Sequence, residues 1–112
     1  MQVVVIGYVW PEPNSSAAGQ NMLNLLEAFV NAGWNTLFAS AAAPSEHAID
    51  LSEIGVRSAT IELNNSSFDA FIQRCGPDVV IFDRFMTEEQ FSWRVKAHAP
   101  DALRVLNTED LH

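Results

Sequence analysis

Val3-Val4-Val5-Ile6-Gly7 is the stretch that decides the fold: a β-branched run, apolar at every position, that ends at a glycine. Strands that are apolar on both faces belong to the buried centre of a parallel sheet, because helices cover both sides of such sheets. A loop with two prolines follows. Residues 21–31 then repeat apolar side chains at the spacing of an amphipathic helix, which we expect to end at Gly33. This beginning predicts an α/β domain.

The alternation of strand and helix continues along the chain. Further strands are predicted at residues 36–39, 56–63, 79–82 and 102–106. We therefore expect a doubly wound, Rossmann-like three-layer domain of about five parallel strands, in the order 3-2-1-4-5. Residues 1–112 are enough for a single domain of this kind.

Two helix starts carry specific signals. Ser66 and Asp69 form a candidate N-cap pair for a helix that precedes Gly76. Thr87 and Gln90 have the spacing of a capping box, which predicts that the next helix begins directly after Thr87.

Composition and charge exclude several kinds of partner. Hydrophobic residues make up 48% of the chain, and the formal net charge is −8. No Lys or Arg precedes Arg57, so no basic patch is available to hold a nucleic-acid backbone or an anionic membrane. A nucleotide is still allowed, because backbone N–H groups at a helix start bind phosphate without basic side chains.

The single cysteine and the three histidines suggest neither a disulfide nor a metal site. Cys75 lies on an apolar helix face and is interpreted as a small buried hydrophobic residue. His47, His98 and His112 have no spacing typical of metal ligands. No apolar run reaches the roughly 20 residues that cross a bilayer, and the cytoplasm is the expected location.

The predicted topology brings three segments together at one edge: residues 8–19, 83–86 and 107–112. In doubly wound sheets the ligand crevice lies outside the carboxyl ends of the strands, where the strand order reverses. Asp83 ends a central strand there, and its carboxylate can orient a hydroxyl, act as a base or simply cap the next loop. Arg84 can pair with a phosphate or with Asp83. The small residues from Ser15 to Gly19 let a ligand approach the start of a helix.

Four segments carry a resemblance to a known family. Residues 5–20 (VIGYVWPEPNSSAAGQ) resemble the opening of family 4-type GT-B glycosyltransferases, and residues 22–36 (MLNLLEAFVNAGWNT) resemble the helix and strand that follow. Residues 77–83 (PDVVIFD) are similar to the family's fourth strand. Thr108-Glu109-Asp110 lies where the family often has a Thr-x-His-Asp-like stretch. Two departures stand out: Ser15-Ser16-Ala17-Ala18 replaces paired glycines, and Glu109 stands where a His is frequent.

The resemblance covers nearly the whole chain but only half of a family member. It implies that residues 1–112 are the acceptor-side domain of an enzyme that transfers a sugar from a nucleotide-sugar donor to an acceptor hydroxyl, with neither metal nor cofactor. A donor-binding domain, in cis or in trans, completes the site in that family. We therefore expect the isolated chain to transfer no sugar and to self-associate through apolar carboxyl-end loops. The residues implied are Asp83 and Glu109 for catalysis, and Ser15, Ser16, Gly19, Trp10, Arg84 and Asp110 for substrate binding.

Other functions remain as alternatives. The chain can be a non-catalytic partner subunit of a split glycosyltransferase. A receiver-like signalling domain also has this size and a strand ending in Asp, but its first loop needs an acidic pair, and this loop offers only Glu12. A dinucleotide site needs Gly-x-Gly-x-x-Gly, whereas Gly7 is followed by no glycine before Gly19. A phosphate-binding P-loop needs Gly-Lys-Ser/Thr, and no Lys precedes Lys96.

Overall fold

The computed structural model describes residues 1–12, 17–44 and 48–108, and it confirms the predicted α/β fold class. All pairings in the five-stranded sheet are parallel, in the order β3-β2-β1-β4-β5. The strands are β1 (Gln2–Gly7), β2 (Asn35–Ser40), β3 (Arg57–Thr60), β4 (Val79–Asp83) and β5 (Leu103–Asn107). The helices are α1 (Ala17–Asn31), α2 (Ser67–Cys75) and α3 (Phe85–His98), with a short 3₁₀ helix, η1 (Leu51–Ile54).

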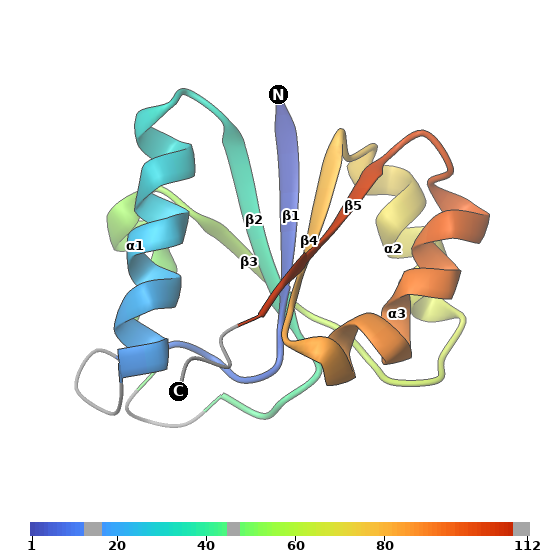
Figure 1. Cartoon of the computed structure of the whole chain (residues 1–112), viewed down its shortest axis with the longest axis horizontal. Coiled ribbons are helices and arrows are strands. Elements are labelled where there is room, and N and C mark those ends of the chain that lie inside the picture. The colour runs from blue at the N-terminus through green and yellow to red at the C-terminus, as the bar shows by residue number, and fades with distance from the viewer. Residues whose placement is uncertain (13–16, 45–47, 109–112) are drawn as a thin grey trace.

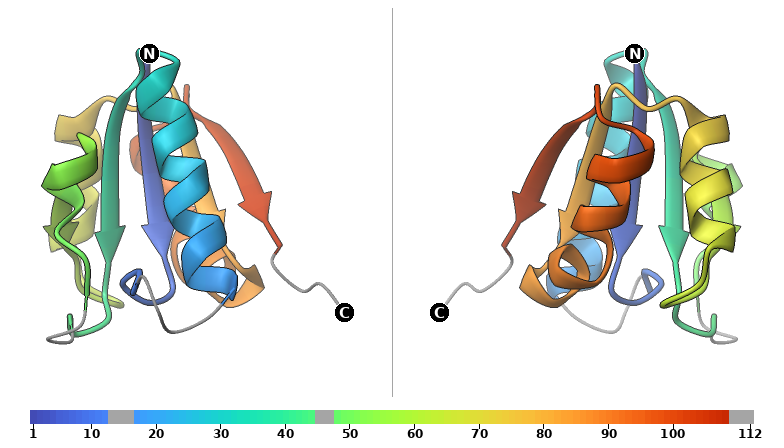
Figure 2. Two further views of the ribbon diagram at one scale, coloured as in Figure 1. Left: turned by 90° about the vertical axis from the view of Figure 1, so that its left-hand side faces the viewer. Right: turned by 90° about the vertical axis from the view of Figure 1, so that its right-hand side faces the viewer.

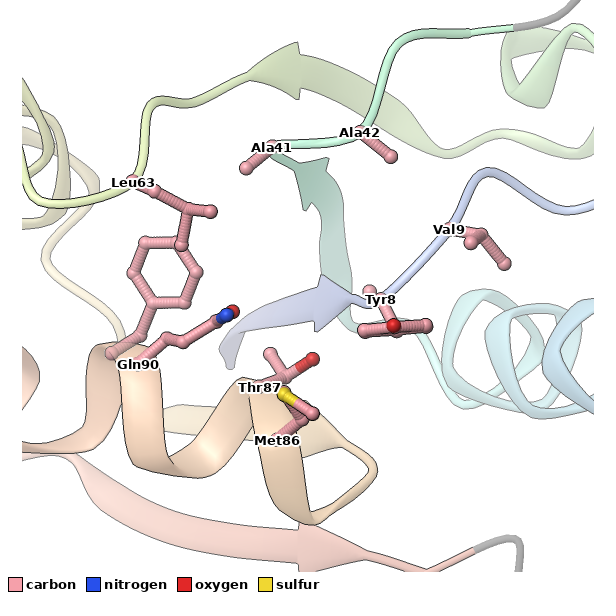
Figure 3. A pocket seen from close by; sticks show the side chains of 10 residues that line it. Tyr8, Val9, Ala41, Ala42, Leu63, Met86, Thr87 and Gln90 are labelled. Carbon is pink, nitrogen blue, oxygen red and sulfur yellow. The ribbon is translucent and has the colours of Figure 1, made fainter.

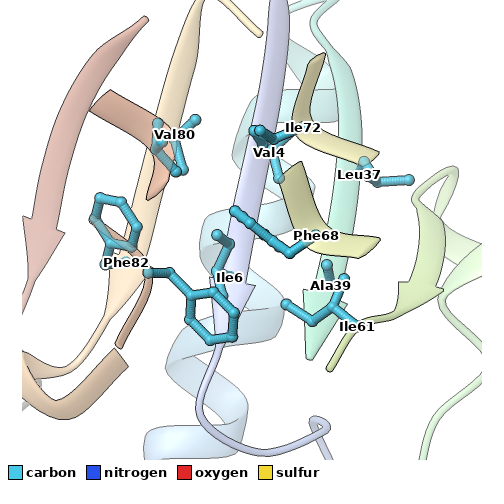
Figure 4. Close-up of a cluster of buried hydrophobic side chains, with 11 residues drawn as sticks. Val4, Ile6, Leu37, Ala39, Ile61, Phe68, Ile72, Val80 and Phe82 are labelled. Carbon is cyan, nitrogen blue, oxygen red and sulfur yellow. The ribbon is translucent and has the colours of Figure 1, made fainter. Parts of the chain in front are cut away.

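Helices cover both faces of the sheet, with α1 on one side and α2 and α3 on the other (Figures 1 and 2). The central strand β1 supplies both cores. Val3 and Val5 pack under α1, whereas Val4 and Ile6 pack with Phe68 of α2 in the opposite cluster (Figure 4). Successive side chains of a strand point to opposite faces, so a strand covered on both sides is apolar throughout. This is the physical reason for the opening run of the sequence.

Of the two predicted helix caps, the one at Ser66 is right in position and the one at Thr87 is wrong. Ser66 makes no side-chain capping bond, and the side-chain oxygen of Asn65 instead accepts from the backbone N–H of Ser67 at 2.8 Å. Helix α3 begins at Phe85 rather than after Thr87. Strand β4 runs directly into α3 through the single residue Arg84, so Thr87 lies inside the first turn of the helix and is buried.

The α1 face of the edge strand β5 is left exposed. β3 is at one edge and β5 is at the other. Leu103 and Val105 pair in register with Val79 and Ile81, which places all four on the α1 face. Both β5 residues are exposed, and the ribbon shows α1 on the β1–β2 side of this face, away from β5 (Figure 2).

Candidate functional site

The carboxyl ends of all the strands lie at one edge, because the sheet is entirely parallel. Helices α1 and α3 begin at the same edge, on opposite faces of the sheet (Figure 1). The connection after β1 crosses one face and the connection after β4 crosses the other. The switch point therefore falls between β1 and β4, which is where such folds form their ligand crevice.

A row of mostly polar residues ends the central strands. Gly7 pairs in register with Ser40, and Asp83 pairs with Asn107. Ile6 pairs with Phe82, so the next residues, Gly7 and Asp83, lie at the same level. Side chains in register on parallel strands point to one face, and this row continues the face that carries Val5 and Ile81. Ser40, Asp83 and Asn107 thus share the α1 side of the edge.

Asp83 is held in this row as a buried carboxylate. It is 4% exposed, and Ser40, on the far side of β1 in the same row, is 0% exposed. The Ser40 hydroxyl accepts from the backbone N–H of Ala42 at 3.1 Å. Arg84 provides a positive charge, with its Nε 3.9 Å from Asp83 Oδ2. A carboxylate at such an edge can accept a hydrogen bond, or a proton, from a hydroxyl that enters the crevice. The sequence analysis did not single out Ser40 or Asn107, although each is the polar last residue of its strand.

Arg84 has the most unusual backbone in the described chain. Its φ is 77° and its ψ is 155°, a region that is almost exclusive to glycine. Its backbone N–H donates to the carbonyl of Asn107 at 2.8 Å, which ties the turn to β5. Its guanidinium lies over the ring of Tyr8, 5.2 Å from the centroid. Strain of this kind persists where the surroundings impose it, and it concentrates at functional sites. The guanidinium of this strained residue lies beside Asp83 at the switch point.

Trp10 stabilises the first loop through contacts with the second strand and the loop after it. Its indole N–H donates to the carbonyl of Ala42 at 2.7 Å, and its ring packs at 5.4 Å from the ring of Phe38. These contacts fasten the loop after β1 to the loop after β2. Its role in ligand binding stays a prediction.

The other predicted site residues divide into two groups. Gly19 lies in the first turn of α1, whose backbone N–H groups begin at the carboxyl edge. Ser15, Ser16, Glu109 and Asp110 lie outside the described residues. The structure thus brings Asp83, Arg84 and Trp10 to the edge with the start of α1.

A pocket of about 360 Å³ opens beside this site, formed by four segments of the chain (Figure 3). Its location on the α2–α3 side follows from Phe91, which belongs to the core of that face. Its described lining residues are Gly7, Tyr8, Val9, Ala41, Ala42, Leu63, Met86, Thr87, Gln90 and Phe91. Sequence reasoning missed the pocket and assigned Thr87 and Gln90 to a helix cap. Only the folded chain shows that they face the ends of β1 and β2.

Large apolar side chains are exposed around the same edge. Tyr8, Val9, Phe85 and Met86 are all among the exposed hydrophobic residues. Contiguous apolar surface on a monomer usually marks a contact site. Self-association through these loops stays a prediction.

Within residues 1–12, 17–44 and 48–108, no three His, Cys, Asp or Glu side chains are grouped so as to hold a metal ion. Burial raises the pKa of the Cys75 thiol, although Arg57 and Arg74 act in the opposite direction. Among the described helices, none has the length and apolar character to cross a membrane.

Comparison with known proteins leaves the family open. No family model matches the chain, and no curated protein matches it significantly.

Proposed function

We propose that this domain is the acceptor-side half of a GT-B-type glycosyltransferase, which transfers a sugar from a nucleotide-sugar donor to an acceptor hydroxyl. Support comes from the four resembling segments and from the Rossmann-like sheet, whose strand order is the one expected for such a domain. A donor-binding domain completes the site in this proposal.

The observation that carries the proposal is the Asp83–Arg84 pair at the switch point. Asp83 is buried at the end of β4, and the strained backbone of Arg84 holds a guanidinium 3.9 Å from it. Sugar transfer needs a base near the acceptor hydroxyl and positive charge near the departing diphosphate. In this proposal Asp83 contacts the hydroxyl, while Arg84 and the start of α1 face the diphosphate.

A binding experiment tests the diphosphate part of the proposal. The ¹⁵N-labelled chain is titrated with uridine, guanosine and adenosine diphosphates and with the corresponding diphosphate sugars. We expect one nucleotide class to shift the amide signals of Gly7, Gly19 and Arg84.

Two arginine variants give a matched comparison for this titration. Arg84→Gln should weaken nucleotide binding, whereas Arg104→Gln should leave it unchanged, because exposed Arg104 reaches Ser92 on α3 rather than the edge. Absence of shifts at these three amides with every nucleotide would argue against the proposed function.

A further inference from the structure

The pocket beside the Asp83–Arg84 pair has an uncharged and mainly apolar lining. Its described walls carry no ionised side chain, in a chain whose net charge is −8. Apolar groups come from Val9, Leu63 and Met86. The polar groups are the hydroxyl of Thr87, the amide of Gln90 and the phenol of Tyr8. Pockets of this kind bind the body of a small molecule through apolar contact and fix its orientation with a few hydrogen bonds.

The pocket is large enough for a small ligand and is open to solvent. A volume of about 360 Å³ is near the lower end of the range for small-molecule sites. Tyr8, Val9, Leu63 and Met86 line it and remain exposed, so apolar surface is left in contact with water. Figure 3 shows the amide end of Gln90 directed toward the space between α3 and the end of β1. A ligand with an apolar ring and a hydroxyl can contact the apolar side chains and hydrogen-bond with the polar groups of the pocket.

Tyr8 connects the pocket to the candidate site. Its side chain lines the pocket, and the guanidinium of Arg84 lies over its ring at 5.2 Å from the centroid. Arg84 is in turn 3.9 Å from Asp83. Asp83 belongs to the α1 side of the sheet and the pocket opens on the α2–α3 side, and Tyr8 contacts both the pocket and Arg84. A group that extends from the pocket past Tyr8 therefore approaches the Asp83–Arg84 pair.

We infer that this pocket binds the apolar body of an uncharged, hydroxyl-bearing acceptor, an assignment of substrate class that rests on the function proposed above. The acceptor places one or two rings against Tyr8, Leu63 and Met86. Its hydroxyl end passes Tyr8 toward Asp83. An acceptor with a carboxylate or phosphate in the pocket is disfavoured, because the described lining offers no cation to compensate for the hydration that the ionised group loses there.

The test uses two probes that share one ring system and differ in charge: naphthalene methanol and naphthalene carboxylate. The ¹⁵N-labelled chain is titrated with each probe, without any sugar nucleotide. We expect the alcohol to shift the amide signals of Tyr8, Val9, Thr87 and Gln90. We expect it to bind at least about tenfold more tightly than the carboxylate, since even a partial desolvation cost of about 1.4 kcal/mol corresponds to that factor.

Two Leu→Trp variants provide the matched control. Leu63→Trp fills the pocket and should weaken binding of the alcohol at least about tenfold, by loss of the apolar contact area. Leu103→Trp adds the same side chain on the α1 face of β5 and should leave binding unchanged. Leu63 is 45% exposed and Leu103 62%, so both positions accommodate the larger ring. Thermal unfolding of both variants checks that they remain folded.

The outcomes separate this inference from the proposed function. Equal or tighter binding of the carboxylate, shifts confined to other surfaces, or unchanged binding in Leu63→Trp would overturn the inference while the nucleotide test stands. If the alcohol binds as expected and every nucleotide fails at Gly7, Gly19 and Arg84, the ligand class of the pocket is supported. The transferase function is then overturned.

Discussion

The ring of Phe38 occupies the space beside Gly7 that the Cβ of any other residue would need. A Cβ at position 7 would overlap Phe38 Cζ and would lie 2.6 Å from Cε2. Gly7 ends β1 between Ser40 and Asp83, so this contact sets how closely the first loop packs at the switch point. The glycine therefore serves the packing of the α1-side core as well as the turn.

Gly7→Ala should destabilise the fold by about 1–3 kcal/mol through overpacking. Urea denaturation measures the change. Phe38→Leu removes the overlapping ring atoms, so the double variant should lose less stability than the sum of the single variants. Additive losses would mean that the clash with Phe38 is not the cause.

At position 84, a glycine variant should be more stable than an alanine variant, which is the reverse of the usual order. Both Arg84→Ala and Arg84→Gly remove the side chain, but only glycine adopts φ 77° without strain. We expect the glycine variant to be more stable by about 1 kcal/mol, after allowance for the greater freedom of the unfolded chain. At Glu89, an exposed position inside α3, alanine should instead be the more stable variant by about 1 kcal/mol. If the alanine and glycine variants had the same order of stability at both positions, the backbone of Arg84 would not be strained.

The ion pair between α2 and α3 should contribute to stability. Arg94 Nη1 donates to both carboxylate oxygens of Asp69, at 2.9 and 3.0 Å, and their side chains are 13% and 18% exposed. Asp69→Asn should cost about 1.5–3 kcal/mol, because it removes a charge-assisted contact from a largely buried cation. Arg104→Met breaks only the exposed bond to Ser92 and should change the free energy of unfolding by less than about 0.5 kcal/mol. Similar losses in both variants would show that burial adds nothing to the Asp69–Arg94 contact.

Cys75 should react slowly with alkylating reagents in the folded chain. Burial raises the pKa of its thiol, so less thiolate is present at a given alkaline pH than in the unfolded chain. Iodoacetamide modification, followed by mass spectrometry across pH, should show a profile shifted to higher pH in the folded state.

The same pKa shift predicts a pH dependence of stability. The folded state favours the neutral thiol, so this contribution is fully present below the unfolded-state pKa. It is lost as pH rises through the folded-state pKa. Cys75→Ala should remove this alkaline loss of stability, and an unchanged slope would assign the loss to other groups.

If the function proposed above holds, Asp83 and Gly19 should affect different kinetic constants of the two-domain enzyme. Asp83→Asn keeps the shape and removes the charge, and it should lower kcat by about 10²–10⁴-fold if the carboxylate is the base. Gly19→Val obstructs backbone approach at the start of α1 and should mainly raise the KM for the donor. Steady-state kinetics with the donor-binding domain present measures both. A near-normal kcat in Asp83→Asn would show that Asp83 is not the base and has only a structural role at the end of β4.

The sheet could be predicted from the sequence because its signals are local. The runs at Val3–Ile6 and Val79–Phe82 are apolar at every position, which requires cover on both faces, and Gly33 has the positive φ expected of a helix end. Asp83 and Arg84 could be placed at the carboxyl edge of the sheet for a related reason. They directly follow a central strand, and the ends of parallel strands meet at one edge.

The sequence alone thus determined the order of elements and the central place of β1 and β4, and it predicted the edge at which a ligand would bind. Only the tertiary structure decided what that edge contains. It placed Asp83 and the pocket on opposite sides of the sheet, turned Thr87 from an expected cap into a pocket wall, and revealed the strained backbone of Arg84. Strand and helix periodicity depends on neighbours a few residues apart. The pocket depends on side chains from four separate segments that meet only when the strands align in register.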